Sequence, residues 1–431
     1  MKADEACDLL VSPGELAGSI AAIPSKSYAQ RIYIAAALAD APTRVVRGEF
    51  VSDDMQASLS ALSTMGARFD SQADSDVIYP LDVTRPSLTP QVNCRESGTV
   101  ARLLLPILTA LFDAGSLTGE GSLPARPFKT LCKTLEQNPG TNFDQYKLPL
   151  KWKGRLQAGR YRLRGDESSQ YLSGLLFALP LLPEDSEIEL TTPLQSAGYV
   201  DMTLEVLSQF GITVDRSKEG HYRIEGRQRY RSPGELRVEG DWSNSAFWLA
   251  AGIEVRGLNP DSLQRDREFL QLKGQKEIDA TDVPDLVPIL SVYAALHEDI
   301  TCIQGIRRLR IKESDRIQTS LAMLDALGYK AWLCEDCGDE LYIQGIRGGT
   351  AEEATTENKE AAGSIFATTF DGGTVEAVVD GANDHRIVMA AAIAASFAQT
   401  PVKIKGAQAV AKTYAHFFED FKSLGGIVHV I

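Results

Sequence analysis

The sequence lacks most of the features that would assign a function class at once. No uninterrupted apolar stretch reaches roughly 18 residues, so we expect no membrane span. The opening MKADEACDLL has no long apolar run, so we expect no secretory signal and a cytoplasmic location. The two Gly-rich loops that bind nucleotides and dinucleotides are absent, and so is the G-x-S-x-G elbow of a serine nucleophile. Nucleotide-binding and serine-hydrolase folds therefore have little support.

Potential metal ligands are also scarce. The chain has only 5 His, none in a metal-binding spacing, and its 6 Cys fit reduced thiols better than a disulfide framework. Cys334 and Cys337 form a single C-x-x-C, without a second pair to complete a zinc site and without the helix start of a redox motif. We interpret this pair as an incidental loop feature. We expect neither a metal nor another cofactor.

Positive charge is in the minority. The chain has 44 Lys and Arg against 58 Asp and Glu, a formal net charge of -14. This balance argues against non-specific binding of nucleic acid, although it leaves room for a local basic site. Hydrophobic residues make up 44% and charged residues 24%, as in soluble globular proteins. Because 431 residues exceed one typical core, two domains are the default expectation.

A polar cluster that leads into a small or apolar helical run occurs six times. Successive starts lie 69 to 75 residues apart by subtraction, and short β-like runs such as YRLRG and SEIELTT lie between them. The pattern predicts six mixed α/β modules, although any α/β protein has some helix starts of this kind. The acidic segment Gly348–Ser364 is expected to be an exposed loop. The six runs begin at Lys26, Ser97, Ser168, Ser243, Lys312 and His385.

Cations gather at these helix starts. Lys26 and Arg31 lie in the first turns of the first predicted helix, with Ser27 on the same face as Arg31. A helix N-terminus already presents N–H groups and partial positive charge, so further cations are unfavourable unless an anion binds there. Further cations in or near such clusters are Arg102, Arg126, Lys312, Arg316, Arg386 and Lys412.

Two segments combine such cations with carboxylates. In RIKESDRI, Glu313 and Arg316 are predicted to lie one helical turn apart. They form either a surface salt bridge, or a site in which Lys312 and Arg316 bind an anion while Glu313 transfers a proton. The stripe of apolar residues that follows predicts a helix that ends at Gly328. Asp285 in TDVPDLVPIL is either a helix cap or a general base. His385 either caps a helix or polarises an anion.

Ten segments, in matching order from about Leu16 to Phe421, together resemble the EPSP synthase (3-phosphoshikimate 1-carboxyvinyltransferase) family. They are PSKSYAQR, SGTVAR, ARPFKTL, SSQYLSGLL, SAGYVDMTL, GDWSNSA, VPDLVP, IKESDRI, NDHRIVMA and AKTYAHFF. The resemblance implies a transferase of aromatic amino acid biosynthesis, with phosphoenolpyruvate and shikimate 3-phosphate as its small-molecule substrates. It implies a monomer without nucleic-acid or membrane partners.

The resemblance also implies an α/β fold of two similar domains, each of three βαβαββ units, with the active site in the interdomain cleft. The domains would be residues 1–20 plus 238–431, and residues 21–237. The implied catalytic residues are Asp285, Glu313, Lys26 and Lys312. The implied shikimate 3-phosphate ligands are Lys26, Ser27, Arg31, Ser168, Ser169, Gln170, Ser196, Tyr199, Asp285 and Lys312. The implied phosphoenolpyruvate ligands are Lys26, Gly98, Arg126, Gln170, Arg316, Arg386 and Lys412, with Gly98 leaving room for the phosphate.

Three departures from the family pattern bear on ligand affinity. Arg95-Glu96 stands where many members have Gly-Asn, Arg308 where many have Asn, and PSKS lacks a Gly between Pro and Ser. The sister transferase that acts on a UDP-sugar is disfavoured, because its typical Cys is missing from GSLPARP. A non-catalytic anion-binding protein is disfavoured as well, since Asp285, Glu313 and Lys312 are all present.

Overall fold

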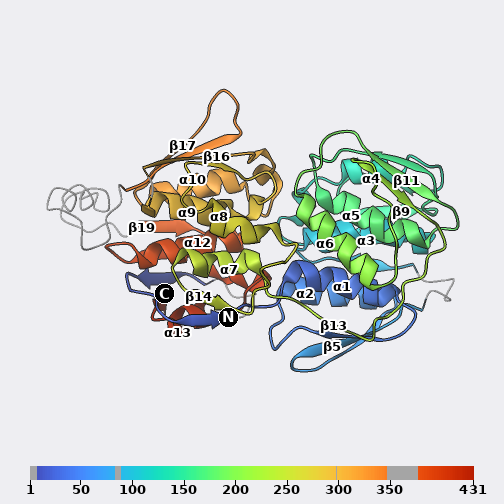
Figure 1. Cartoon of the computed structure of the whole chain (residues 1–431), viewed down its shortest axis with the longest axis horizontal. Coiled ribbons are helices and arrows are strands. Elements are labelled where there is room, and N and C mark those ends of the chain that lie inside the picture. The colour runs from blue at the N-terminus through green and yellow to red at the C-terminus, as the bar shows by residue number, and fades with distance from the viewer. Residues whose placement is uncertain (1–6, 83–88, 298, 347–376) are drawn as a thin grey trace. The chain divides into compact units, whose positions relative to one another are not determined.

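The computed structural model describes residues 7–82, 89–297, 299–346 and 377–431 (Figure 1). The chain divides into two compact units, one of Met1–Ile23 with Asp241–Ile431 and the other of Pro24–Gly240. The expected acidic loop at 348–364 lies outside the described residues. Within the described ranges, no helix is both long and apolar enough to cross a membrane.

Among its described residues, the unit Pro24–Gly240 contains three sheets. One has the order β13(Glu235–Arg237), β3(Thr43–Val46), β5(Ser75–Tyr79), β4(Arg68–Ser71). The second has the order β6(Gln91–Asn93), β7(Ala114–Thr118), β9(Leu150–Lys153), β8(Asn142–Phe143). The third has the order β10(Arg160–Leu163), β11(Ser186–Leu190), β12(His221–Ile224). The helices are α1(Lys26–Leu38), α2(Asp53–Thr64), α3(Gly98–Leu111), α4(Lys129–Leu135), α5(Ser169–Ala178), α6(Ala197–Gln209) and the short η1(Leu123–Ala125) and η2(Leu179–Leu181).

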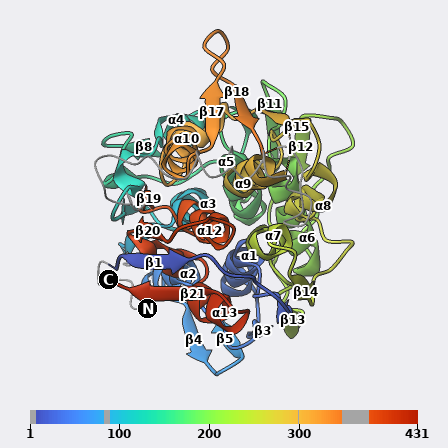
Figure 2. The same ribbon diagram turned by 90° about the vertical axis from the view of Figure 1, so that its left-hand side faces the viewer.

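The described part of the other unit also contains three sheets, and its first strand joins the C-terminal strands (Figure 2). One sheet has the order β19(Ala377–Asp380), β20(Val402–Lys405), β1(Leu9–Ser12), β21(Ile427–Val430). Another has the order β15(Glu277–Asp279), β16(Ile300–Gln304), β18(Glu340–Gln344), β17(Lys330–Leu333), and the third pairs β14(Glu254–Arg256) with β2(Ser19–Ala21). The helices are α7(Trp242–Ala250), α8(Phe269–Leu272), α9(Val287–His297), α10(Arg316–Ala326), α12(His385–Ser396), α13(Phe417–Ser423), η3(Arg265–Glu268), η4(Pro284–Leu286), η5(Arg307–Ile311) and η6(Ala407–Lys412).

The same pairing scheme recurs among the described strands. In each four-stranded sheet the first two strands in the order are parallel, and the two further pairings are antiparallel. The sheet of β10, β11 and β12 follows the same scheme without a fourth strand. A parallel pair needs a crossover connection, and helices such as α3 between β6 and β7 provide it.

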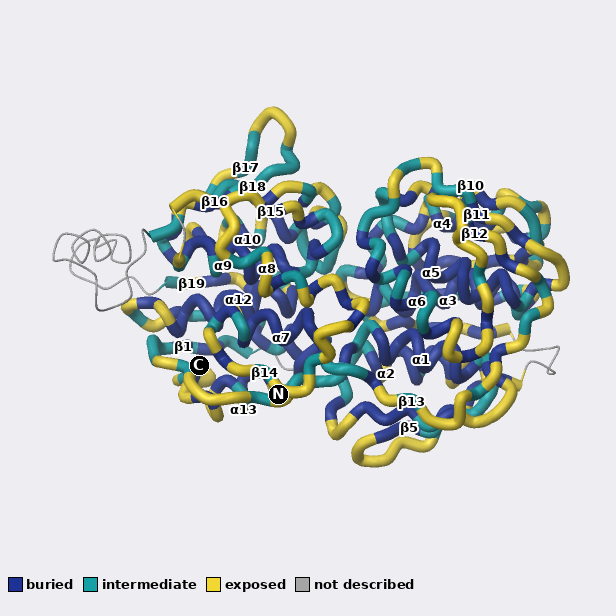
Figure 3. Tube along the Cα trace, in the orientation of Figure 1, coloured by how far each residue is buried: buried dark blue, intermediate teal, exposed yellow. Residues whose placement is uncertain are grey.

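Helices α3 and α12 are buried because small and aliphatic residues occupy every face of each helix. Every residue of α12 is buried, and α3 is buried from Val100 to Ala110, as the dark blue tube in Figure 3 shows. At Gly174 of α5, an added Cβ would lie 2.6 Å from the carbonyl oxygen of Arg102, so α3 and α5 approach too closely for a larger residue. This close approach packs the middle of α5 against the first turns of α3.

The polar start of one predicted helix lies outside that helix. The helix expected after Lys312 begins at Arg316, because Asp315 caps it by accepting from the N–H groups of Ile317 and Gln318 at 3.2 and 3.3 Å. Lys312 has an extended backbone. Lys312 and Glu313 therefore lie in the segment before α10. The predicted end is confirmed, since Gly328 has the left-handed φ of 79° that follows many helix C-termini.

Candidate active site

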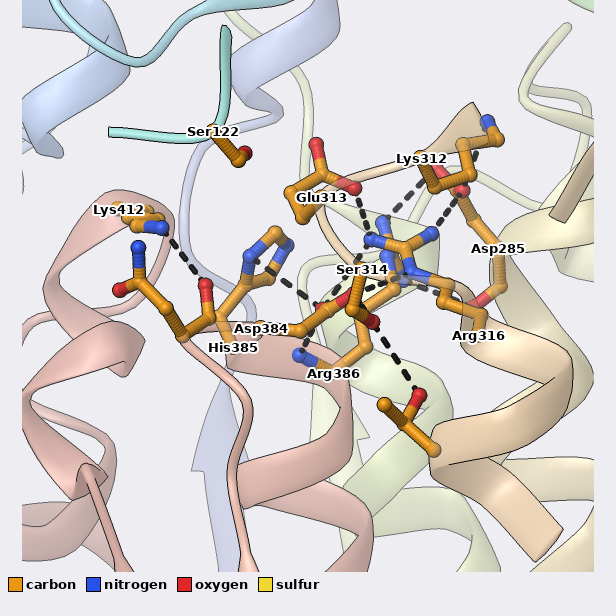
Figure 4. Close-up of polar contacts among 12 residues, drawn as sticks. Ser122, Asp285, Lys312, Glu313, Ser314, Arg316, Asp384, His385, Arg386 and Lys412 are labelled. Carbon is orange, nitrogen blue, oxygen red and sulfur yellow. Dashed lines mark hydrogen bonds and ion pairs between the residues drawn. The ribbon is translucent and has the colours of Figure 1, made fainter. Parts of the chain in front are cut away.

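In the unit that holds α10 and α12, the polar cluster centres on Asp285 (Figure 4). Its Oδ1 accepts from Lys312 Nζ at 3.2 Å and from Arg316 at 2.7 Å, and its Oδ2 accepts from Arg386 at 3.1 Å. Arg386 also donates to the backbone carbonyl of Asp285 at 3.0 Å. Three cations, two from the segment Lys312–Arg316 and one from α12, thus converge on one carboxylate. The alternative role of Asp285 as a helix cap was wrong, because Asp285 lies inside η4, whose N-cap is Val283.

Arg316 links this carboxylate to two others. Its guanidinium donates to Glu313 Oε2 at 2.5 Å and to Asp384 Oδ2 at 2.7 Å, in addition to Asp285. The side chain is 1% exposed and that of Asp384 is 0% exposed, so this is a buried charge network rather than a surface salt bridge. Asp384 also accepts from the hydroxyl of Ser314 at 3.0 Å. A buried guanidinium with several acceptors has little freedom to move.

The charges in this cluster shift each other's pKa. Burial by itself would raise the pKa of Asp285, but Arg386, Lys312 and Arg316 together hold it well below its usual value. The pKa of Lys312 is lowered, chiefly because it loses water and also because Arg316 is close, and the attraction of Asp285 offsets this only in part. The carboxylates around Arg316 outweigh its burial and raise its pKa. Asp285 is therefore ionised at neutral pH.

The start of α12 supplies the remaining residues of this cluster. Asp384 caps the helix by accepting from the N–H of Arg386 at 3.0 Å, so the alternative that His385 is the cap was wrong. His385 is the first residue of α12 and is buried. Lys412, at the end of η6, donates to the carbonyl oxygen of Asn383 at 2.7 Å, which brings it next to this helix start.

In the unit Pro24–Gly240, a second polar cluster lies at the helix start that the sequence analysis singled out. Lys26 is the first residue of α1, whose first turn has no acidic residue, and its Nζ lies 2.9 Å from Asp54 Oδ2 on α2. Gln30 donates to Ser97 Oγ and to the carbonyl oxygen of Asp54, both at 3.2 Å. These contacts tie the beginnings of α1, α2 and α3 together.

Gln170 and two arginines extend this cluster. Gln170 accepts from Arg102 at 2.9 Å and donates to Thr99 Oγ1 at 2.9 Å, so α5 and α3 meet at their N-terminal ends. An added Cβ at Gly98 would lie 2.7 Å from Arg126 Nη1. The space beside Gly98 is therefore occupied by the guanidinium of Arg126.

Arg31 is enclosed rather than exposed. It is 1% exposed and donates to the carbonyl oxygen of Ser27 at 2.8 Å, to Thr203 Oγ1 at 2.9 Å and to the carbonyl oxygen of Tyr199 at 3.0 Å. Burial lowers its pKa to about 10, which still leaves it charged at neutral pH. Arg31 thus fixes the chain at Ser27 and at the start of α6.

The serine residues of the predicted site lie at helix starts. Ser168 caps α5 by accepting from the N–H of Gln170 at 3.3 Å, and Ser169 is the first residue of that helix. Ser196 precedes α6 with a left-handed φ of 56°. Such positions place hydroxyl and N–H donors together, as anion sites at helix N-termini require.

Sequence reasoning missed three acidic residues of these clusters. Asp54 and Asp384 pair with Lys26 and Arg316, but each belongs to a helix start where Asp is ordinary, so no local signal marks it. Asp266 is 6% exposed in η3, and burial together with the nearby charge of Asp285 raises its pKa to about 7. Arg102 was noted as a cation but not placed with Gln170.

The departures from the family pattern can also be placed. Arg308 donates to the carbonyl oxygen of Thr281 at 2.6 Å. Arg95 has a left-handed φ of 48°, and Glu96 lies against Gly121, where an added Cβ would be 2.4 Å from the Glu96 carboxyl carbon. Glu96 is thus directed toward the loop that follows β7.

Solved structures with the same fold are enolpyruvyl-transfer enzymes by name. An EPSP synthase from Acinetobacter baumannii has a TM-score of 0.75 at 22% identity, covering 99% of this chain and 100% of that chain. The enolpyruvyl transferase NikO from Streptomyces tendae has a TM-score of 0.72 at 15% identity, covering 99% of each chain. The fold is therefore the two-domain α/β fold of this class of enzymes.

Sequence similarity defines the family. The profile of EPSP synthase (3-phosphoshikimate 1-carboxyvinyltransferase) matches residues 11–276 and 259–421. The 3-phosphoshikimate 1-carboxyvinyltransferase of Clostridium beijerinckii is 35% identical over 97% of this chain and 98% of its own length. That of Clostridium kluyveri is 36% identical over 96% of this chain and 97% of its own. The chain belongs to the EPSP synthase family, as the order of the ten segments indicated.

Proposed function

We propose that this protein transfers the enolpyruvyl group of phosphoenolpyruvate to the 5-hydroxyl of shikimate 3-phosphate and releases phosphate. The observation that carries the proposal is the carboxylate of Asp285 held by Lys312, Arg316 and Arg386. Both substrates are multiply charged anions. A site for them needs fixed cations, and these cations stand beside two carboxylates that can move protons.

In the proposed reaction, Asp285 accepts the proton of the 5-hydroxyl as its oxygen bonds to C2 of phosphoenolpyruvate. Glu313 delivers a proton to the methylene carbon, which gives a tetrahedral ketal. In the second step the bond between C2 and the phosphate oxygen breaks, and Glu313 takes back one proton from the methyl group, which restores the double bond. Asp285 passes the hydroxyl proton to the departing phosphate, so both carboxyl groups return to their starting states.

The low pKa of Asp285 makes it a weak base before substrate binds. A phosphate or carboxylate that binds Arg316 and Arg386 would share their charge and raise the pKa of Asp285. Phosphoenolpyruvate would thereby strengthen the base that the second substrate requires.

The remaining roles follow the family pattern. We propose that Lys26, Gln170, Gly98, Arg126, Arg386 and Lys412 serve phosphoenolpyruvate, with Gly98 acting through Arg126. Lys26, Lys312 and Gln170 would also reach shikimate 3-phosphate. The groups that bind its phosphate and ring would be Ser27, Arg31, Ser168, Ser169, Ser196 and Tyr199. Arg31 would contribute charge and hold Ser27 and Tyr199 in place, since it donates to both of their carbonyl groups.

The test is phosphate release from phosphoenolpyruvate by the purified protein, with and without shikimate 3-phosphate. We expect release only with both substrates, and a fall in kcat of roughly 10²–10⁴-fold for Asp285→Asn and for Glu313→Gln. The matched control is Asp325→Asn on the exposed face of α10, which should keep full activity. Release that requires a UDP-sugar would overturn the substrate. Binding of shikimate 3-phosphate without turnover would make this a binding protein.

We also propose, on the family pattern, that the enzyme is a cytoplasmic monomer. Sedimentation equilibrium should give a mass near the 46.9 kDa of one chain, and twice that mass would reject a monomer.

A further inference from the structure

The turn between β17 and β18 holds a group of potential metal ligands that the proposed reaction does not use. This hairpin turn extends from the β15–β18 sheet in both ribbon views (Figures 1 and 2). The Sγ atoms of Cys334 and Cys337 and a carboxylate oxygen of Glu340 all lie within 4.8 Å of one another. In a tetrahedral zinc site two thiolates are roughly 3.8 Å apart, since Zn–S bonds are about 2.3 Å long. Small side-chain rotations would therefore bring the three ligands to one ion.

The backbone of the turn is shaped around the two sulfurs. Gly338 N–H donates to the carbonyl oxygen of Cys334 at 2.9 Å, which closes the turn, and Gly338 has the left-handed φ of 60°. The N–H of Asp339 donates to the Cys337 sulfur at 3.5 Å. N–H donors of this kind stabilise a thiolate, which is the form that binds metal.

The third ligand is oriented by the sheet. Glu340 is the first residue of β18, and the Tyr342 hydroxyl donates to its Oε2 at 2.8 Å. Leu341 is buried, so the alternation along the strand puts Glu340 and Tyr342 on the opposite, outer face. Support of this kind from a neighbouring side chain is typical of carboxylates that bind metal ions.

We propose that Cys334, Cys337 and Glu340 bind one thiolate-preferring divalent cation, Zn²⁺ or a close analogue, with water at the fourth position. The sequence analysis interpreted this C-x-x-C as incidental because no third ligand was apparent, and the hairpin supplies Glu340 as that ligand. Two thiolates and one carboxylate suit a tetrahedral ion and disfavour Mg²⁺ or Ca²⁺, which prefer oxygen ligands.

Because the turn contacts η5, binding of an ion there would also affect that neighbouring segment. Asp339 accepts from the N–H of Arg307 at 2.6 Å, and Arg310 donates to the carbonyl oxygen of Gly338 at 3.4 Å. Both arginines belong to η5, which leads directly to Lys312. Metal binding would therefore brace the segment that precedes Lys312 and Glu313.

The test is Zn²⁺ binding to the full-length, fully reduced, chelator-stripped protein, measured by competition with a chromophoric chelator. We expect one equivalent to bind, and Co²⁺ in its place to give the absorption bands of tetrahedral thiolate ligation. Cys334→Ser and Cys337→Ser should each weaken Zn²⁺ binding by more than about tenfold, and Glu340→Gln by a smaller factor. Cys7→Ser is the control and should leave binding unchanged.

Three results would overturn the proposal. One is the absence of stoichiometric binding, and another is binding that persists in the double variant Cys334→Ser/Cys337→Ser. The third is a pair that binds no metal when reduced and only oxidises to a disulfide, which would make it a redox pair. Circular dichroism of each variant separates these results from misfolding. Because the assay does not depend on turnover, it stands apart from the test of the transfer reaction.

Discussion

Asp384 is a single residue whose loss should affect both stability and catalysis. It is fully buried, it pairs with Arg316 at 2.7 Å, and it caps α12. Asp384→Asn keeps the shape and the cap but removes the charge that balances the buried guanidinium. Breaking a buried ion pair in this way typically costs about 3–5 kcal/mol. We therefore expect a lower melting temperature and a reduced kcat/KM.

Thermal unfolding and phosphate release would measure the two effects of Asp384→Asn. Asp325→Asn, on the exposed side of α10, is the control for removing an aspartate charge. Wild-type stability and activity in Asp384→Asn would show that Arg316 does not need this partner.

The raised pKa of Asp266 predicts that the free energy of unfolding depends on pH. Its pKa is raised from 3.8 to about 7, chiefly because it is buried and also because it is close to Asp285. Asp241 raises the pKa slightly further, whereas Arg386 and the hydrogen bond from Ser243 lower it. Between pH 4 and 7 the folded protein holds a proton that the unfolded chain releases. Stability therefore falls as pH rises through this window, and the full penalty remains above pH 7.

Asp266→Asn removes this titration. We expect the melting temperature of the variant relative to wild type to be higher at pH 8 than at pH 5. Asp261→Asn, an exposed neighbour in sequence, should show no such difference. An equal effect at both pH values would show that Asp266 does not titrate between pH 5 and pH 8.

At the scale of elements, Gly98 at the N-terminus of α3 leaves the space that the Arg126 side chain occupies. The Cβ of Gly98→Ala would lie 2.7 Å from Arg126 Nη1, so the guanidinium must move. Because alanine is the better helix former, stability should change little while the KM for phosphoenolpyruvate rises. Steady-state kinetics with varied phosphoenolpyruvate measures this.

Gly14→Ala is the matched control, since its nearest neighbours would be at an ordinary 3.6 Å. An unchanged KM in Gly98→Ala would argue against a role of Arg126 in binding phosphoenolpyruvate.

The start of α10 shows how an element boundary depends on a single cap. The apolar residues of this helix were visible in the sequence, but IKESD contains several residues that can begin a helix, and only the structure selects Asp315. Asp315→Ala should destabilise the protein by about 1 kcal/mol, while Asp315→Asn, which can still cap, should have a smaller effect. Urea denaturation measures the difference. Equal losses for both variants would indicate that the ion pair with Arg310 matters more than the cap.

At the scale of the whole molecule, an acidic protein is expected to gain stability from an acidic ligand. The net charge is -14, yet the two clusters gather Lys and Arg at buried helix starts. Shikimate 3-phosphate that binds only the folded state, at 100 times its Kd, should add about 2.7 kcal/mol of stability. A thermal shift assay measures this. Lys26→Ala should reduce the shift, and its absence in wild type would reject the proposed ligand.

The sequence by itself determined the family, the helices that begin at cationic clusters, and most of the residues brought together in the two clusters. These features are local: a run of small residues after a polar start specifies a helix, and ordered motifs specify a family. Only the tertiary structure decided which partners these residues have. It placed Asp384 and Asp285 around Arg316, filled the space beside Gly98 with Arg126, enclosed Arg31, and set Glu340 beside two cysteines. Those outcomes depend on which distant segments pack together, and burial there sets charge and pKa in ways that no local pattern records.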